Sequence, residues 1–145
     1  MNPSLFDLSV GWNGLRWSAT VGDFRRRFPR ATRTFPEQPS VADLVWDTGE
    51  PTEDLVGIPA YSRYLFNKQG QFCAVFFFPQ PPLINRFAPV AAQFTNAFGL
   101  PQWFPEHRRY QWPSGTVRLI LIEEDLGPLG GIVQVILQSP ASRLG

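Results

Sequence analysis

The segment FCAVFFF at 72–78 is the feature that most restricts how this chain can fold. It follows 67–70, a four-residue connection typical of a hairpin, in which Gly70 can take a positive φ. Both alternating sets of its side chains are apolar, which is typical of a strand at the centre of a sheet with both faces covered. The expected alternation places Phe72, Ala74, Phe76 and Phe78 on one face, and Cys73, Val75 and Phe77 on the other.

A short helix is predicted just before Pro29, which cannot continue a helix and so ends it. Thr20 and Asp23 have the spacing of a capping box, with Asp in place of the usual Glu. Phe24 and Phe28 lie one helical turn apart and mark the apolar side. This helix is therefore expected to cover part of the sheet.

The second predicted helix, at 87–98, has the clearest pattern in the chain. Pro89 suits its first turn, where the missing N–H has no helical partner. Gly99, Leu100 and Pro101 then have the sequence form of a Schellman stop, in which the chain folds back on the helix end. The expected apolar stripe consists of Phe87, Val90, Ala91, Phe94, Ala97 and Phe98.

Strand patterns occupy much of the remaining chain, and the short turns between them favour antiparallel pairing. A helix with a single apolar stripe must bury that stripe on another element. The sequence therefore predicts a two-layer α+β fold with two main helices on an antiparallel sheet of about six strands. The predicted strand segments are 41–47, 61–66, 72–79, 108–112, 116–124 and 131–140.

The two halves of the chain show the same order of features. Each half has a helix with two phenylalanines four residues apart, then a strand that ends in Trp-x-[Ser/Thr]-Gly, then two more strands. The Trp-containing motifs lie at 46–49 and 112–115. This pattern predicts one domain, 1–145, built from two α-β-β-β pseudo-repeats at approximately 15–80 and 83–140.

Composition excludes several classes of protein. The net charge of +1 provides no general attraction to nucleic acid or to a membrane surface. No apolar run approaches the ~20 residues that a membrane-spanning helix needs. Cys73 is the single cysteine, so neither an internal disulfide nor a four-thiolate metal site is expected. The first residues do not resemble a secretory signal, and the expected location is the cytoplasm.

Catalytic motifs are not apparent in the sequence. It contains no nucleophile elbow, phosphate-binding loop, dinucleotide fingerprint or His-Glu-x-x-His motif. His107 lies among charged residues before a strand, which is typical of a solvated loop. Cys73 lies in an apolar strand, where a thiol is typically inert, and a Cys73–His107 pair needs the fold to bring the two together. The expectation is a protein that is not an enzyme and uses no cofactor or metal.

Charge is segregated along the chain, and 40–60 holds five acids and no base. Three interpretations of this acidic run stay open: a solvated loop, an electrostatic face for a basic partner, or a site for a hard cation. Its spacing matches no calcium-binding loop. The acids are Asp43, Asp47, Glu50, Glu53 and Asp54.

Aromatic and basic residues supply the other candidate binding sites. Trp46 and Trp112 end strands at corresponding positions, and Trp is enriched at recognition hot spots, although core packing is the slightly favoured interpretation of each one taken individually. The Arg-rich segment 25–33 has the composition of a solvated helix face or of a phosphate-binding patch. The residues predicted to bind a partner are Asp47, Glu50, Glu53, Asp54, Trp46 and Trp112.

The tandem arrangement of a helix followed by antiparallel strands with terminal aromatics resembles the layout of bacterial β-lactamase inhibitor proteins. The related fold of small outer-membrane assembly lipoproteins is similar too. This chain departs from both, since it lacks the paired cysteines of the inhibitors and a lipoprotein leader. Its segregated charge, many aromatics and lack of catalytic motifs also resemble small cytoplasmic bacterial immunity proteins. Both resemblances imply a domain that occludes a protein partner, such as a toxin or an enzyme.

Other functions stay open beside protein binding. One is a domain that binds a small apolar ligand between sheet and helices, with Phe72, Phe76 and Phe94 lining a cavity. Another is a scaffold subunit that associates with itself, for which a homodimer is the simplest form. A hydrolase that uses Cys73 and His107 is a third. Nucleic acid is not an expected partner, because the chain as a whole is not basic.

Overall fold

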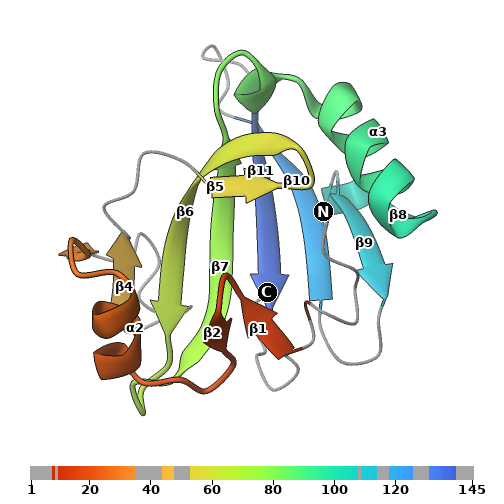
Figure 1. Cartoon of the computed structure of the whole chain (residues 1–145). Helices are drawn as coiled ribbons and strands as arrows, with labels where there is room; N and C mark the ends of the chain where they lie inside the picture. Colours follow the sequence, from red (N-terminus) through yellow and green to blue (C-terminus); the bar gives the residue numbers. More distant parts are fainter. Residues whose placement is uncertain are drawn as a thin grey trace.

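The computed structural model describes residues 8, 10–34, 44–47, 53–107, 109–113, 118–125 and 131–139 (Figure 1). Their main feature is an antiparallel sheet of nine strands. The strands are β3 (Thr32–Thr34), β4 (Leu44–Asp47), β5 (Glu53–Leu55), β6 (Ile58–Phe66), β7 (Phe72–Pro79), β8 (Gln102–Phe104), β9 (Arg109–Pro113), β10 (Arg118–Asp125) and β11 (Gly131–Gln138).

Eight of these strands follow one another across the sheet in the order β3-β4-β6-β7-β11-β10-β9-β8. Strand β5 pairs with the first part of β6, along the same edge that β4 occupies farther on. The predicted α+β fold, with two helices and an antiparallel sheet, is confirmed. So is the central position of β7, which lies between β6 and β11.

The predicted count of about six strands is wrong, because the sheet has nine. The three that the sequence does not reveal are β3, β5 and β8, with three residues each. A segment of that length is too short to show an alternating pattern. These strands form because a longer neighbour supplies the partner backbone.

Helices α2 (Val21–Arg27) and α3 (Phe87–Phe98) lie on the same side of the sheet, toward its opposite ends (Figure 1). The predicted capping box of α2 is confirmed: the Asp23 N–H donates to Thr20 Oγ1 and the Thr20 N–H donates to Asp23 Oδ2, both at 3.1 Å. The helix ends before Pro29, as expected. Within the described ranges, no helix is long and apolar enough to cross a membrane.

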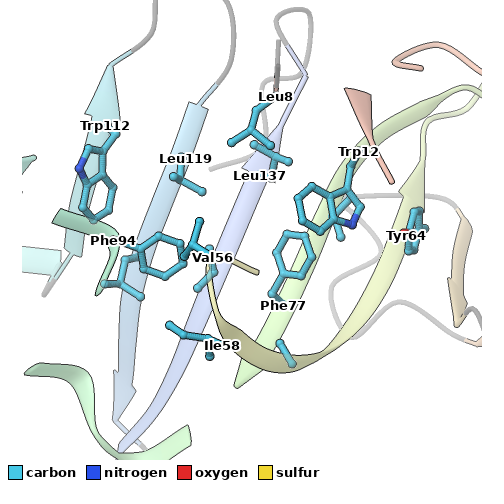
Figure 2. Close-up of a cluster of buried hydrophobic side chains, with 14 of the residues drawn as sticks. Leu8, Trp12, Val56, Ile58, Tyr64, Phe77, Phe94, Trp112, Leu119 and Leu137 are labelled. Carbon is cyan, nitrogen blue, oxygen red and sulfur yellow. The ribbon is translucent and has the colours of Figure 1, made fainter. Parts of the chain in front are cut away.

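The core lies between the sheet and the elements on this side, which we call the helix face. A small hairpin of β1 (Gly11–Trp12) and β2 (Leu15–Arg16) adds to its cover, and two short 3-10 turns, η1 (Leu83–Asn85) and η2 (Pro105–His107), flank α3 and β8. Trp12 packs edge-on against Phe77 of β7, with ring centroids 4.9 Å apart (Figure 2). Phe24 of α2 and Phe94 of α3 are fully buried.

A bulge in β7 changes the expected division of its side chains. Leu65 pairs with Ala74 but Phe66 pairs with Phe72, so Cys73 is an extra residue opposite β6. The predicted grouping of Phe72 with Ala74 is therefore wrong. Phe72 joins Val75 and Phe77 in the core of the helix face, whereas Cys73 and Ala74 belong to a second cluster with Val45, Leu65 and Phe76.

The chain order and the sheet order divide the fold into two halves of the same topology. In the first half, α2 is followed by β3, β4, β6 and β7; in the second, α3 is followed by β8, β9, β10 and β11. The last strands of the two halves pair with each other, Phe77 with Val135 and Val75 with Leu137. Each half therefore has four strands in the main row, where three were predicted.

Helix α3 ends differently from the prediction. Gly99 has φ of 90° and ψ of −167°, and its N–H donates to the Thr95 carbonyl at 2.9 Å. A Schellman stop would fold Leu100 back onto the helix. Instead, Leu100 is 88% exposed.

Candidate functional site

The candidate site lies on the side of the sheet away from α2 and α3, here called the outer face. Val75 and Phe77 belong to the core, so the residue between them, Phe76, points to the outer face. Residues paired across an antiparallel sheet share a face. The register therefore defines one outer row across seven strands: Asp47, Arg63, Phe76, Ile136, Ile120, Gln111 and Gln102.

The middle of this row is apolar and partly accessible. Phe76 and Ile136 are partly exposed, whereas Ile120 is 2% exposed. Farther along β7, the partly exposed Phe78 pairs with Tyr61, which is 51% exposed. The neighbouring cluster of Val45, Leu65, Cys73 and Ala74 is buried. The outer face is thus covered in part within the chain, and an apolar strip around Phe76 remains accessible.

Charged side chains border this strip at both ends. Arg63 Nε lies 3.8 Å from Asp47 Oδ1, and its guanidinium lies over the ring of Phe78 at 5.7 Å. On β9, the guanidinium of Arg109 lies over Phe104 at 5.1 Å, and its buried Nε has no hydrogen-bond partner. An apolar centre with a polar rim is the usual anatomy of a protein–protein interface, and Arg and aromatic residues are enriched there.

Some of the acidic residues predicted to bind a partner lie on β4 and β5, at the Arg63 end of the strip. Asp47 is in the outer row and is paired with Arg63, so its charge is partly compensated. Glu53 and Asp54 lie on β5, beside β6, opposite Ala60 and Pro59. Glu50 lies outside the described residues, and so does Asp43. The structure brings the β4 and β5 backbones to one edge of β6.

Trp112, the second of the two predicted aromatic anchors, lies in the core. It is 1% exposed and points to the helix face. Its ring centroid is 5.7 Å from that of Phe94 on α3, and its indole N–H donates to the Gly99 carbonyl at 2.8 Å. Trp112 fastens the end of α3 to β9, and no part of it is presented to a partner.

Trp46 has a corresponding position on β4 but a different environment. It also points to the helix face, with its ring 6.0 Å from that of Phe24 on α2. The ring is partly exposed, the Arg25 guanidinium lies over it at 5.6 Å, and its buried indole N–H has no hydrogen-bond partner among the described residues. Trp46 and the outer row therefore lie on opposite faces of the sheet.

The arginines of α2 make contacts close to their own helix. Arg26 pairs with Asp23, and Arg27 Nε–H donates to the Asn13 carbonyl at 3.2 Å. Together with Arg25 over Trp46, these contacts place the guanidinium groups on a solvated helix surface. This arrangement agrees with the first of the two interpretations of the segment 25–33.

Cys73 is the one residue considered for catalysis whose side chain lies in the described part of the chain. Cys73 is 8% exposed, and its thiol donates to the Leu65 carbonyl at 3.4 Å. His107 closes η2, and its side chain lies outside the described part. Among the described side chains, no group of three or more His, Cys, Asp or Glu residues is placed to hold a metal ion.

The cavity considered for an apolar ligand does not form from the residues expected to line it. Phe72 and Phe94 are buried in the helix-face core, whereas Phe76 points to the outer face. The sheet itself separates them. The bulge at Cys73 is the reason, because it places Phe72 and Phe76 on opposite sides of the sheet, although an even spacing of four positions would otherwise place them on the same side.

The outer face contains residues that the sequence pattern did not indicate, namely Ile136 and Gln111 of the outer row and Arg109 beside it on β9. Their strands were predicted, but the order of strands across the sheet was not. The available indication was the alternation in GIVQVILQ, where Gln134 and Gln138 mark the side that faces away from the core. Comparisons of this chain with protein-family models, with curated proteins and with solved structures found no match.

Proposed function

We propose that this chain is a non-enzymatic protein-binding domain that occludes a protein partner, as an inhibitor or immunity protein does. The observation that carries the proposal is the outer row, with partly exposed Phe76 and Ile136 in its middle and polar groups at both ends. Such a strip matches the core and rim of a protein interface. It lies on a sheet, whose rigid backbone presents the side chains with little loss of freedom on binding.

The charges on the outer face favour a protein over other partners. Asp47 lies at one end of the row, with the acidic strand β5 beside it, and Arg109 lies toward the other. A partner with both signs of charge would match both ends, whereas the single sign of a nucleic acid would match only one.

The topology supports a duplicated unit as the origin of this surface. Each half supplies a helix and four strands, and the halves join at β7 and β11, in the middle of the outer row. We place the two pseudo-repeats near 15–80 and 83–140, within one domain at 1–145. A bacterial cytoplasmic location, where an immunity protein meets its toxin, fits a chain whose single cysteine is a buried thiol.

The test is affinity purification of the tagged protein from its host, followed by native mass measurement of the complex. We expect a partner in a simple ratio, and we expect its own activity to be blocked while it is bound. The variant Ile136→Arg places a charge in the middle of the accessible strip and should abolish the complex. Because Ile136 is partly exposed, the variant should remain folded, and its circular dichroism spectrum checks this.

The matched control is Gln69→Arg, which adds the same charge in the exposed β6–β7 turn, away from the outer row. It should retain the partner in full. A partner that remains bound to Ile136→Arg would show that the outer face is not the contact surface. A protein recovered alone under all conditions would overturn the binding function.

A further inference from the structure

We infer that a second copy of this chain binds in an open groove beside α3, so that the protein forms a two-fold symmetric dimer. The groove has a volume of about 560 Å³. Alanines 88, 91 and 92, with Thr95 and Asn96, form its wall on α3, and Tyr110 of β9 and Leu100 close it. It lies on the helix side of the sheet, so this inference does not depend on the outer face.

The groove is lined by apolar side chains together with the polar Thr95 and Asn96, over an aromatic floor. Phe87 stacks on Tyr110 with ring centroids 5.6 Å apart, and Trp103 packs on Tyr110 at 4.7 Å. Trp103 is 44% exposed next to the groove. Exposed aromatic and aliphatic side chains that gather around one groove are typical of an interaction surface.

The same surface carries a group that fits the groove. Leu100 is 88% exposed at the end of α3, since Gly99 directs the chain outward there. A two-fold contact requires each copy to offer both a projection and the hollow that receives it. If two α3 helices lie antiparallel, Leu100 of each copy reaches the Ala88 end of the other. The helix is about 18 Å long at 1.5 Å per residue, so both contacts form at once.

The lack of charged residues along the groove favours a second copy as its occupant. The stretch 87–105 contains no charged residue, and it is the longest such stretch in the sequence. Near a two-fold axis, any charge would face the same charge of the other copy, so a surface without charge suits contact with itself. Partners of different sequence are usually steered by opposite charge, which this surface does not offer.

The test is sedimentation equilibrium of the purified chain over a range of micromolar concentrations. We expect a dimer. Leu100→Ser removes the projection and should weaken dimerisation at least tenfold, and Ala92→Arg, near the expected axis, should leave only monomer. Both residues are exposed, so neither change should alter the circular dichroism spectrum of the folded chain.

Two variants that carry opposite charges at position 92 make the test specific to the two-fold arrangement. Ala92→Arg and Ala92→Asp should each be monomeric, and an equal mixture of the two should form a heterodimer. Gln69→Arg is the control and should dimerise like the unmodified chain. A monomeric unmodified chain, or a dimer that resists both substitutions, would overturn the inference. A mixture that stays monomeric would overturn the antiparallel arrangement of α3.

Discussion

The two halves of the molecule place a helix and four strands in the same topology, but their surfaces differ. Helix α2 carries Arg25, Arg26 and Arg27 on its exposed side, whereas α3 carries no charged residue. Trp46 beneath α2 is partly exposed and its indole N–H lacks a partner, whereas Trp112 beneath α3 is buried and bonded. The two halves thus share their topology but differ in the charge of the helix surface and in the environment of the strand tryptophan.

The buried contact that both halves share is the one between a helix phenylalanine and a strand tryptophan. Phe24 meets Trp46 and Phe94 meets Trp112, with ring centroids 6.0 and 5.7 Å apart. This contact fixes the helix on the second strand of its half. The two halves differ in what surrounds this contact. Three sets of variants test the shared contact and the differences around it.

The largest effect is expected from removing the phenylalanines. Phe24→Ala and Phe94→Ala each leave a cavity at a fully buried site, and each should lower the free energy of unfolding by about 3–5 kcal/mol. Urea denaturation measures both. Gln69→Ala, in the exposed β6–β7 turn, is the control and should change the free energy of unfolding little. A loss below about 1 kcal/mol for only one phenylalanine would mean that the two halves do not share this packing role.

Replacing each of the two tryptophans with phenylalanine should lower the stability of the protein by different amounts. Trp112→Phe removes the indole N–H that donates to the Gly99 carbonyl and should cost about 1 kcal/mol, the net contribution of an ordinary hydrogen bond. Trp46→Phe removes a buried N–H that has no partner and should change stability by less than about 0.5 kcal/mol. Thermal unfolding of the two variants gives the comparison. Equal losses would show that the indole hydrogen bond is not what separates them.

The smallest change in stability is expected from substitutions at the N-caps of the two helices. Thr20→Ala removes the side-chain cap of α2 and should cost about 1 kcal/mol, whereas Arg86→Ala should cost almost nothing, because Arg86 makes no side-chain cap on α3. Melting temperatures at neutral pH measure this difference. If the two substitutions have equal effects, the capping box does not stabilise α2 in the folded protein.

The same cap gives α2 a pH dependence that α3 lacks. Hydrogen bonds from the Thr20 backbone N–H and its hydroxyl hold the pKa of the Asp23 carboxyl below its ordinary value of 3.8. Stability from the ionised carboxylate is therefore present above that value and is lost as the pH falls through the lowered pKa. The difference in melting temperature between Thr20→Ala and the unmodified chain should narrow in strong acid.

Local sequence determined the elements of this fold whose causes are local. The capping box at Thr20 and Asp23, the turn that ends at Gly70 and the apolar stripe of α3 all follow from neighbouring residues, and the structure contains each of them. The central position of β7 follows from its apolar character on both faces. In these cases the side chains that decide the structure are adjacent in sequence.

Tertiary structure alone decided the rest, because it depends on strands that are distant in sequence. The three-residue strands β3, β5 and β8 exist only beside their partners, and the bulge at Cys73 arises from the pairing of β6 with β7. The outer row joins residues from 47 to 136, so no local pattern reveals it. The contrast between Trp46 and Trp112 has the same origin, since a carbonyl acceptor on the end of α3 satisfies only one of two similar side chains.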